Sequence, residues 1–240
     1  TDAEVTDANE LKAFNTDGFR LGTGGDVNAD GTKTVAWAWD AGTAAVTPID
    51  SGGITPSAVW KNRTAGFSIT QYAGSGSNHS VPHDLGAKPD FYVVKKTTGV
   101  GSWRAWHSSL DSGKSIDLHS DAAQFTDDSF TQEVDNNYVY LNGSVGNVNA
   151  SGSTYIIYAW TSIPGYSSFG TWEGNGSTDG PMILTGFRPA FILYKNADTA
   201  GRNWFVHDSK RSPTNGGVKY LLSNAYWAEG TNIGGDLDIL

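Results

Sequence analysis

The segment Asp26-Val27-Asn28-Ala29-Asp30-Gly31 carries a side-chain oxygen at every second position, which is the spacing of a calcium-binding loop. Alternate oxygens can converge on one ion, so Asp26, Asn28 and Asp30 are candidate calcium ligands. An EF-hand loop also needs an acidic residue at its twelfth position, where this chain has Trp37. A hairpin turn built on Asn and Asp side chains is the alternative, and no other cofactor is expected.

A second pattern of metal-ligand type is the pair His79 and His83, which lie four residues apart. On one face of a helix this spacing can bind zinc. Pro82 and the neighbouring serines favour an extended segment instead, so a zinc site is not expected.

Patterns of catalytic residues are weak. A glycosidase needs two carboxylates facing each other across a sugar, at about 5 Å or about 6.5–9.5 Å, and spacing along the chain cannot supply that geometry. The serines of Gly143-Ser144 and Gly152-Ser153 lie in Asn-rich hairpins rather than at a strand-to-helix turn. The chain has no cysteine, which excludes thiol catalysis. We therefore expect that the protein is not an enzyme.

Three tryptophans, Trp60, Trp172 and Trp227, lie near expected turns and are candidate ligand-binding residues. A sugar can stack its apolar face on such a ring while nearby amides bind its hydroxyls. Contact with another subunit is the alternative for Trp60 and Trp227. Tryptophans at repeated strand positions are expected to pack in cores: Trp39, Trp103, Trp160 and Trp204.

Composition indicates an all-β protein of tandem antiparallel β-sandwich-like domains with little helix. The 240 residues include 30 Gly and only 17% charged residues, which favours short strands and tight turns. A net charge of −9 disfavours nucleic acid as a partner. No run of 18 apolar residues exists, so no membrane insertion is expected.

Apolar runs and alternating patterns predict individual strands. One short helix is also expected, over Ala3 to Phe14, with Thr6 or Asp7 as its cap. The expected strands are 91–95, 103–107, 138–141, 154–160, 191–195 and 204–208.

The second half of the chain repeats the first at an interval near 100 residues. Lys88-Pro89-Asp90-Phe91 followed by Lys95 matches Arg188-Pro189-Ala190-Phe191 followed by Lys195. A period of this length suits one small β domain. A second match relates the start of the chain to its middle: Val27-Asn28-Ala29-Asp30-Gly31 leads to Ala38-Trp39 as Val148-Asn149-Ala150-Ser151-Gly152 leads to Ala159-Trp160.

These matches divide the chain into four parts. Residues 66–165 form a complete copy, residues 166–240 the opening part of a further copy, and residues 1–40 a closing part, with residues 41–65 as a linker. The short segment Ser120-Asp121-Ala122 also recurs as Ser223-Asn224-Ala225, and Thr1-Asp2-Ala3 fits the same place.

An incomplete copy would expose apolar faces and bare strand edges, which is costly. The chain could be a piece of a longer repeat protein, its two partial copies could join each other, or one chain could complete the next. We therefore expect homo-oligomers, either a trimer or a head-to-tail assembly.

The complete copy carries a set of motifs: Gly66-Phe67-Ser68-Ile69, Tyr72-x-Gly74-x-Gly76, His83-x-Leu85-Gly86-x-x-Pro89-Asp90-Phe91, Trp103, Val148-Asn149-Ala150-Ser151-Gly152 and Ala159-Trp160. With these motifs, the repeat resembles domains that recur in tandem in tail-fibre and tail structural proteins of tailed phages, notably phages of marine and cyanobacterial hosts. The resemblance implies an all-β structural or adhesive role on the virion tail and carries no catalytic motif.

The resulting expectation is a non-enzymatic structural protein of the virion tail, outside the cell, that contributes to attachment to host-surface glycans. Its partners would be copies of itself, other tail proteins and host polysaccharide. One alternative is a carbohydrate-binding module or a depolymerase subunit. Another is a self-assembling extracellular filament unrelated to virions.

Overall fold

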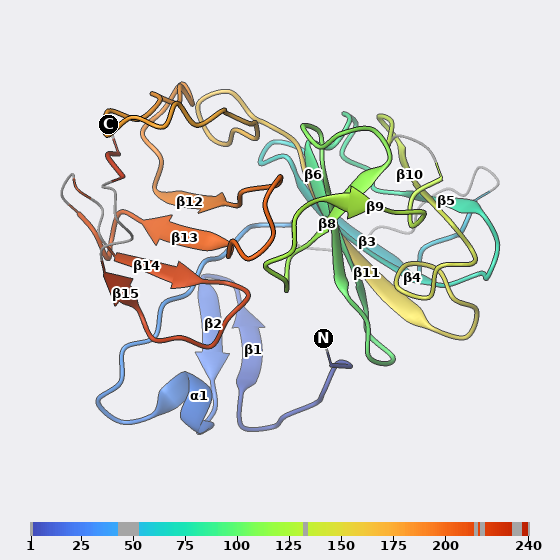
Figure 1. The fold of residues 1–240 in the computed structure, drawn as a ribbon. Coiled ribbons are helices and arrows are strands. Elements are labelled where there is room, and N and C mark those ends of the chain that lie inside the picture. The colour runs from blue at the N-terminus through green and yellow to red at the C-terminus, as the bar shows by residue number, and fades with distance from the viewer. Residues whose placement is uncertain are drawn as a thin grey trace.

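The structure is a computed structural model that describes residues 2–42, 53–131, 134–213, 216, 219–231 and 237–239. Within these residues the regular secondary structure is almost entirely antiparallel β-strand, and the helix α1 spans only Gly25–Asn28 (Figure 1). The expected all-β, sandwich-like class is confirmed. No helix in the described ranges is long and apolar enough to cross a membrane.

The largest sheet contains seven antiparallel strands in the order β3-β4-β11-β6-β7-β8-β9. Its strands are β3 (Ala58–Asn62), β4 (Phe67–Ala73), β6 (Phe91–Lys96), β7 (Trp103–His107), β8 (Lys114–Asp117), β9 (Phe125–Thr126) and β11 (Thr154–Trp160). Strand β11 enters late in the chain but lies between β4 and β6, where Tyr158 pairs with Ile69 on one side and Val93 on the other. The complete copy is therefore closed by its last strand.

The first core lies on one face of this sheet. Alternate residues of β11 point into it, and Tyr155, Ile157 and Ala159 are fully buried. A two-stranded sheet of β5 (His79–Pro82) and β10 (Tyr138–Leu141) covers this face and contributes Val81, Val139 and Leu141. The arrangement is a sandwich with one large and one small layer.

The opposite face of the large sheet forms a second core. Phe91 and Val93 of β6 pack there with Ala105 and Ile116, and Trp204 from the C-terminal part joins them. Strand β6 is thus buried on both faces, which explains why its sequence is a continuous apolar run rather than an alternation.

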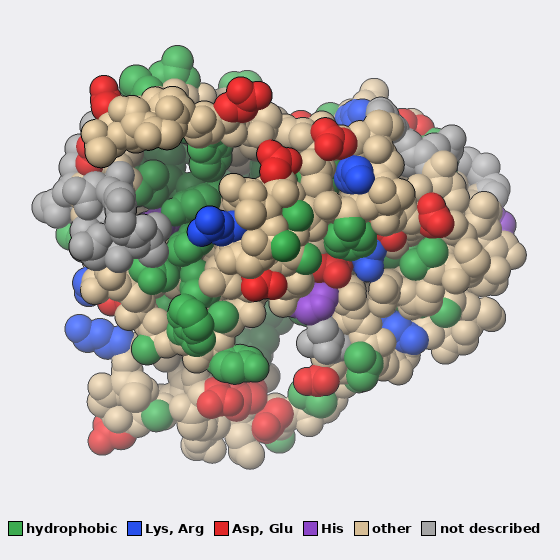
Figure 2. All heavy atoms as spheres, in the orientation of Figure 1, with side chains coloured by type: hydrophobic (Ala, Val, Ile, Leu, Met, Phe, Trp, Pro, Cys, Tyr) green, Lys and Arg blue, Asp and Glu red, His purple; other side chains and the backbone are tan. Residues whose placement is uncertain are grey.

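A four-stranded sheet forms the C-terminal part, with its strands in chain order. Its strands are β12 (Phe191–Tyr194), β13 (Phe205–Asp208), β14 (Lys219–Leu222) and β15 (Gly230–Thr231). All four residues of β12 are only half buried, whereas the first five residues of β6 are buried. Figure 2 shows hydrophobic side chains gathered on the visible face over this sheet.

The strands expected from apolar patterns are confirmed to within one residue at each end. The helix expected over Ala3 to Phe14 is wrong. This region instead leads into a hairpin of β1 (Leu11–Asn15) and β2 (Gly18–Leu21), in which Phe14 pairs with Phe19. The two strands are joined by the two-residue loop Thr16-Asp17, and their pairing outweighs weak helix propensity.

Part of the expected linker, 41–65, belongs to the large sheet, while its residues 43–52 lie outside the described ranges. Strand β3 pairs along its whole length with β4, and Val59 is fully buried. Placing the start of the complete copy at residue 66 is therefore too late. The strand has no counterpart in the repeat comparison, which is why the repeat did not reveal it.

The two partial copies meet within the chain through aromatic rings. Trp39 lies with its ring centroid 5.6 Å from that of Phe191, as Trp160 lies 5.5 Å from Phe91 in the complete copy. Trp37 also contacts Phe191, at 5.5 Å. Among the described residues around these tryptophans, 29–42, none is assigned to a strand. The domain limits at 1–40 and 166–240 stay a prediction.

The burial of Val59 predicts that β3 is an integral part of the folded core. Val59→Ala is expected to lower the free energy of unfolding by about 2 kcal/mol, because it removes two buried methyl groups and leaves a cavity. Val100→Ala is the matched control, since Val100 is 72% exposed and its truncation should change stability by less than about 0.5 kcal/mol. Urea unfolding measures both, and equal small effects would show that β3 is a loosely attached linker.

Candidate functional site

Two short segments dock through their backbones on two equivalent turns, although the bonded residues are two apart in the first segment and three apart in the second. The first is the N-terminal segment, residues 2–4, which lies on the turn between β6 and β7. Lys95 donates from Nζ to the carbonyl oxygen of Asp2 at 2.9 Å, and the backbone N–H of Glu4 donates to the carbonyl of Thr97 at 2.9 Å. A lysine at the end of a strand thus holds a passing segment by its main chain.

The second is the middle segment, residues 121–124, which lies on the turn between β12 and β13. Lys195 donates from Nζ to the carbonyl oxygen of Asp121 at 3.3 Å, and the N–H of Gln124 donates to the carbonyl of Ala197 at 2.6 Å. The N–H of Gly201 also donates to Asp121, at 2.9 Å. Lys195 and Ala197 are the repeat counterparts of Lys95 and Thr97, so the two contacts are versions of one junction.

The junction joins the complete copy to the C-terminal part through side chains as well. Trp204 is 7% exposed and donates from its indole N–H to the carbonyl of Asp117 at 3.0 Å. Gln124 donates from its side chain to Asp198 at 3.1 Å. The two sheets are therefore held together by backbone, amide and aromatic contacts in one place.

A third stretch, residues 226–229, corresponds to the middle segment. Strand pairing relates Lys114↔Thr126 to Lys219↔Thr231, an interval of 105 residues in both strands. The same interval places Tyr226 where the complete copy has Asp121. The sequence comparison matched Ser120-Asp121-Ala122 with a later segment that begins two residues too early. The pairing of β14 with β15 places the structural counterpart of this segment two residues further along the chain.

A pocket of about 430 Å³ opens between the middle segment and this third stretch. Its lining combines aromatic rings with amide, carboxylate, hydroxyl and imidazole groups: His119, Ser120, Asp121, Asn203, Asn224, Ala225, Tyr226 and Trp227. Asn224 is held in place, since it donates to Asn203 at 2.8 Å and accepts from the N–H of Trp204 at 2.9 Å. The rings of Tyr226 and Trp227 are mostly exposed.

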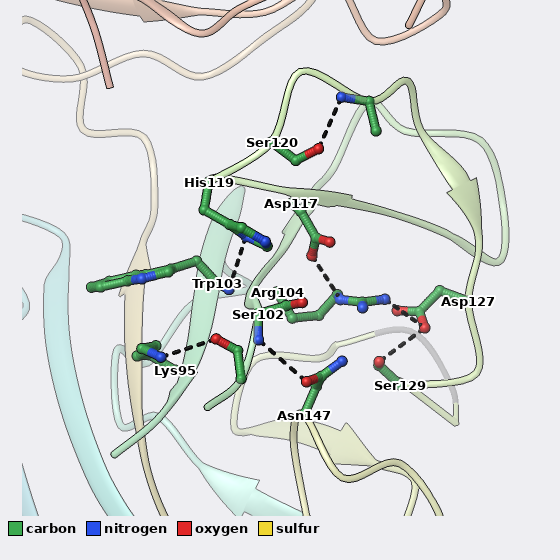
Figure 3. A network of polar contacts seen from close by, with 12 residues as sticks. Lys95, Ser102, Trp103, Arg104, Asp117, His119, Ser120, Asp127, Ser129 and Asn147 are labelled. Atoms are coloured by element: carbon green, nitrogen blue, oxygen red, sulfur yellow. Dashed lines mark hydrogen bonds and ion pairs between the residues drawn. The ribbon is translucent and has the colours of Figure 1, made fainter. Parts of the chain in front are cut away.

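His119 forms part of the pocket wall, and a backbone hydrogen bond orients its ring. Its Nδ1 accepts the backbone N–H of Trp103 at 3.3 Å, which leaves the proton on Nε2 in the neutral ring (Figure 3). Burial lowers the pKa of His119, while the carboxylate of Asp117 acts in the opposite direction. A neutral ring can donate one hydrogen bond to a ligand in the pocket.

A buried ion network lies close to His119 (Figure 3). The Arg104 guanidinium lies 3.0 Å from Asp117 and 2.7 Å from Asp127, and Ser129 donates to Asp127 at 2.9 Å (Figure 3). Burial raises the pKa of Asp117, although Arg104 opposes that shift. Both carboxylates face one cation rather than an open cleft, so their arrangement is that of a structural tie between β7, β8 and the segment after β9.

The three candidate tryptophans lie in different settings. Trp60 is on β3, half buried and paired with Ile69, and so lies in a strand rather than a turn. Trp172 is 45% exposed and packs edge-on against Tyr194. Trp227 alone of the three lines the pocket, where it is 68% exposed.

Of the candidate calcium ligands, Asp26 and Asn28 belong to α1, and Asp30 follows it. Asn28 donates from its side chain to the carbonyl of Gly22 at 2.8 Å, and both Asp26 and Asp30 are exposed. In the described ranges, no group of three or more His, Cys, Asp or Glu side chains is placed to hold a metal ion. Calcium binding here stays a prediction.

The histidine pair has structural roles. His83 is fully buried, with Nε2 at 3.1 Å from the carbonyl of Asp135 and Nδ1 accepting the N–H of Leu85 at 3.3 Å. His79 lies 2.9 Å from the hydroxyl of Ser75. The two rings therefore hold different turns.

A model of a domain of unknown function, DUF7483, matches residues 1–240. The chain belongs to this family. No curated protein and no solved structure matches the chain.

The Arg104 network yields a prediction about stability. Arg104→Met is expected to cost about 3–5 kcal/mol in urea unfolding, because it leaves two buried carboxylates without their cation. Adding Asp117→Asn and Asp127→Asn should restore much of this loss. A cost below about 1 kcal/mol for Arg104→Met would show that these carboxylates are not structurally paired.

Proposed function

We propose that the chain is a non-enzymatic structural protein of a tailed-phage tail fibre or related tail part, in which β repeats are joined in series. The observation that carries the proposal is the repeated junction, in which Lys95 and Lys195 hold equivalent segments by their backbone carbonyls. A contact used twice in one chain is what a protein built by stacking copies requires.

The resemblance of the repeat to phage tail proteins supports a location of the chain on the virion. The surface supports a role in assembly, because hydrophobic side chains in both partial copies are exposed, including Phe14, Met182 and Leu184. Exposed apolar area of this kind marks contact with other protein surfaces, here copies of the chain or other tail proteins.

The location can be tested directly on phage particles. Antibodies raised against the folded chain are expected to label the tail end of intact particles of the phage that encodes it, as seen by electron microscopy. Antibody first absorbed with the purified chain is the control and should leave the particles unlabelled. Label on the head alone, or chain found only outside the particles, would contradict the proposal.

Attachment to host-surface glycans is a second candidate function, favoured by the pocket. Tyr226 and Trp227 offer rings for the apolar face of a sugar, and Asn203, Asp121 and His119 offer polar groups for its hydroxyls. Several weak sites displayed together on one fibre would give useful avidity.

Trp227→Ala is expected to weaken binding to a glycan identified on an array by about tenfold or more, because stacking area is lost. Trp172→Ala is the matched control, since that ring is exposed outside the pocket. The same incubations should release no new reducing ends from host polysaccharide. Release of reducing ends would favour a depolymerase, and no saturable glycan would remove this second function.

A further inference from the structure

Strand β12 has one paired edge and one open edge. It pairs along its whole length with β13, and no strand among the described residues pairs with its other side. In the complete copy, β11 pairs with the equivalent edge of β6. An open strand edge presents a row of backbone donors and acceptors, which another extended segment can bind by strand addition.

The segment that matches β11 in sequence, residues 33–39, already contacts β12. Its Trp39 ring lies 5.6 Å from the ring of Phe191, and the matching rings of β11 and β6 lie 5.5 Å apart in the complete copy. The ring of Trp37 lies 5.5 Å from that of the same phenylalanine. Contact of two alternate side chains with one ring is the pattern of an extended segment, whose alternate residues share a face.

The same segment is anchored beside the large sheet. Asn62, the last residue of β3, donates from its side chain to the carboxylate of Asp40 at 3.0 Å, one residue after the segment ends. The Trp39 ring also lies 6.2 Å from that of Trp160 in β11. Because these contacts hold the segment next to β12, its effective concentration there exceeds that of the same segment from a second copy.

We propose that the open edge of β12 is a strand-binding site and that its ligand is the segment 33–39 of the same chain. In the register of β11 on β6, Ala38 would pair directly with Ile192, as Ala159 pairs with Tyr92. The segment is not assigned to a strand in the described structure, so the site is open there and its ligand lies beside it. This inference goes beyond the structural role proposed above and does not depend on where the chain is located on a virion.

Strand addition would also bring a hairpin toward an apolar face. Leu21 of β2 pairs with Leu11, as Leu141 of β10 pairs with Phe130, so the two hairpins match. Leu141 is fully buried in the first core, whereas Leu21 is 37% exposed. The connection after each hairpin leads into the matching segment, so addition of the segment to β12 draws the β1–β2 hairpin toward the half-buried residues of β12. Burial of these apolar groups favours the closed arrangement.

The chain has no cysteine, so one engineered pair can report this register directly. Directly opposed residues of antiparallel strands have Cα atoms about 4.5–5.5 Å apart, within reach of a disulfide, whereas diagonal neighbours are about 7–8 Å apart. The full chain carrying Ala38→Cys and Ile192→Cys is expected to form a disulfide with glutathione disulfide about tenfold faster than the matched control with Ala36→Cys and Ile192→Cys. Mass spectrometry detects the bond, and circular dichroism establishes that each variant is folded.

The pattern of crosslinking separates the alternatives. A chain that stays monomeric on a non-reducing gel, with the bond formed in the first variant, supports the proposal. Equal rates for the two pairs would overturn it, because they would show a segment that touches β12 without a fixed register. Crosslinked dimers in place of crosslinked monomers would also overturn it, because the ligand would then come from a second copy.

Hydrogen exchange of the unmodified chain, followed by NMR, gives a second readout if the cysteine variants do not fold. Because Thr97 donates to Thr154 in the same register, the amides of Val35 and Trp37 would donate to β12 and that of Ala36 would point away. The first two amides are expected to exchange about a hundredfold more slowly than the third. Exchange of Val35 and Trp37 at the rate of an unstructured segment would overturn the proposal. Tail labelling of phage particles is independent of these results, so the two proposals can fail separately.

Discussion

A strand that is buried on both faces needs a hydrogen-bonding neighbour at both edges, and the rest of the fold follows from this need in β6. Its backbone groups cannot reach water, so an unpaired edge would leave several donors and acceptors unsatisfied. Strand β7 supplies one neighbour through a short turn, but the other is β11, which begins at Thr154. The pairing of β6 is therefore complete only when β11, the last strand of the copy, lies beside it.

The C-terminal sheet shows the consequence of a missing neighbour. In the described chain β12 pairs with β13 alone, and its residues are half buried where those of β6 are buried. The rings of Trp37 and Trp39 cover Phe191, in the manner of Trp160 over Phe91, without forming a ladder. Aromatic contact thus replaces part of the burial that a strand would provide, while the second edge of β12 pairs with no strand among the described residues.

Six of the strands could be predicted from the sequence because their signals are local. The run Phe91-Tyr92-Val93-Val94 is continuously apolar because β6 is buried on both faces. The residues of β11 alternate because this strand is buried on one face. Strand β3 was not predicted because only its pairing with β4 identifies it as a strand. The helix near the N-terminus was wrongly expected because the pairing of β1 with β2 outweighs the helix propensity of this segment. Trp227 was a candidate on sequence grounds, yet its neighbours in the pocket come from segments about one hundred residues apart. The role of Lys95 and Lys195 was not predicted, because a backbone carbonyl acceptor can belong to any residue type and therefore leaves no pattern in the sequence.

The recognition of backbone carbonyls by the two lysines also affects how such proteins can change during evolution. At each junction the groups recognised by the lysine and the turn are main-chain atoms, so Glu4 and Gln124, or Thr97 and Ala197, serve equally. Gln124 of the middle segment also contacts Asp198 through its side chain, but the contacts made by the lysine and the turn depend on the backbone path and not on residue identity. Genetic exchange between repeats, or between related chains, would therefore preserve these backbone contacts while replacing exposed side chains.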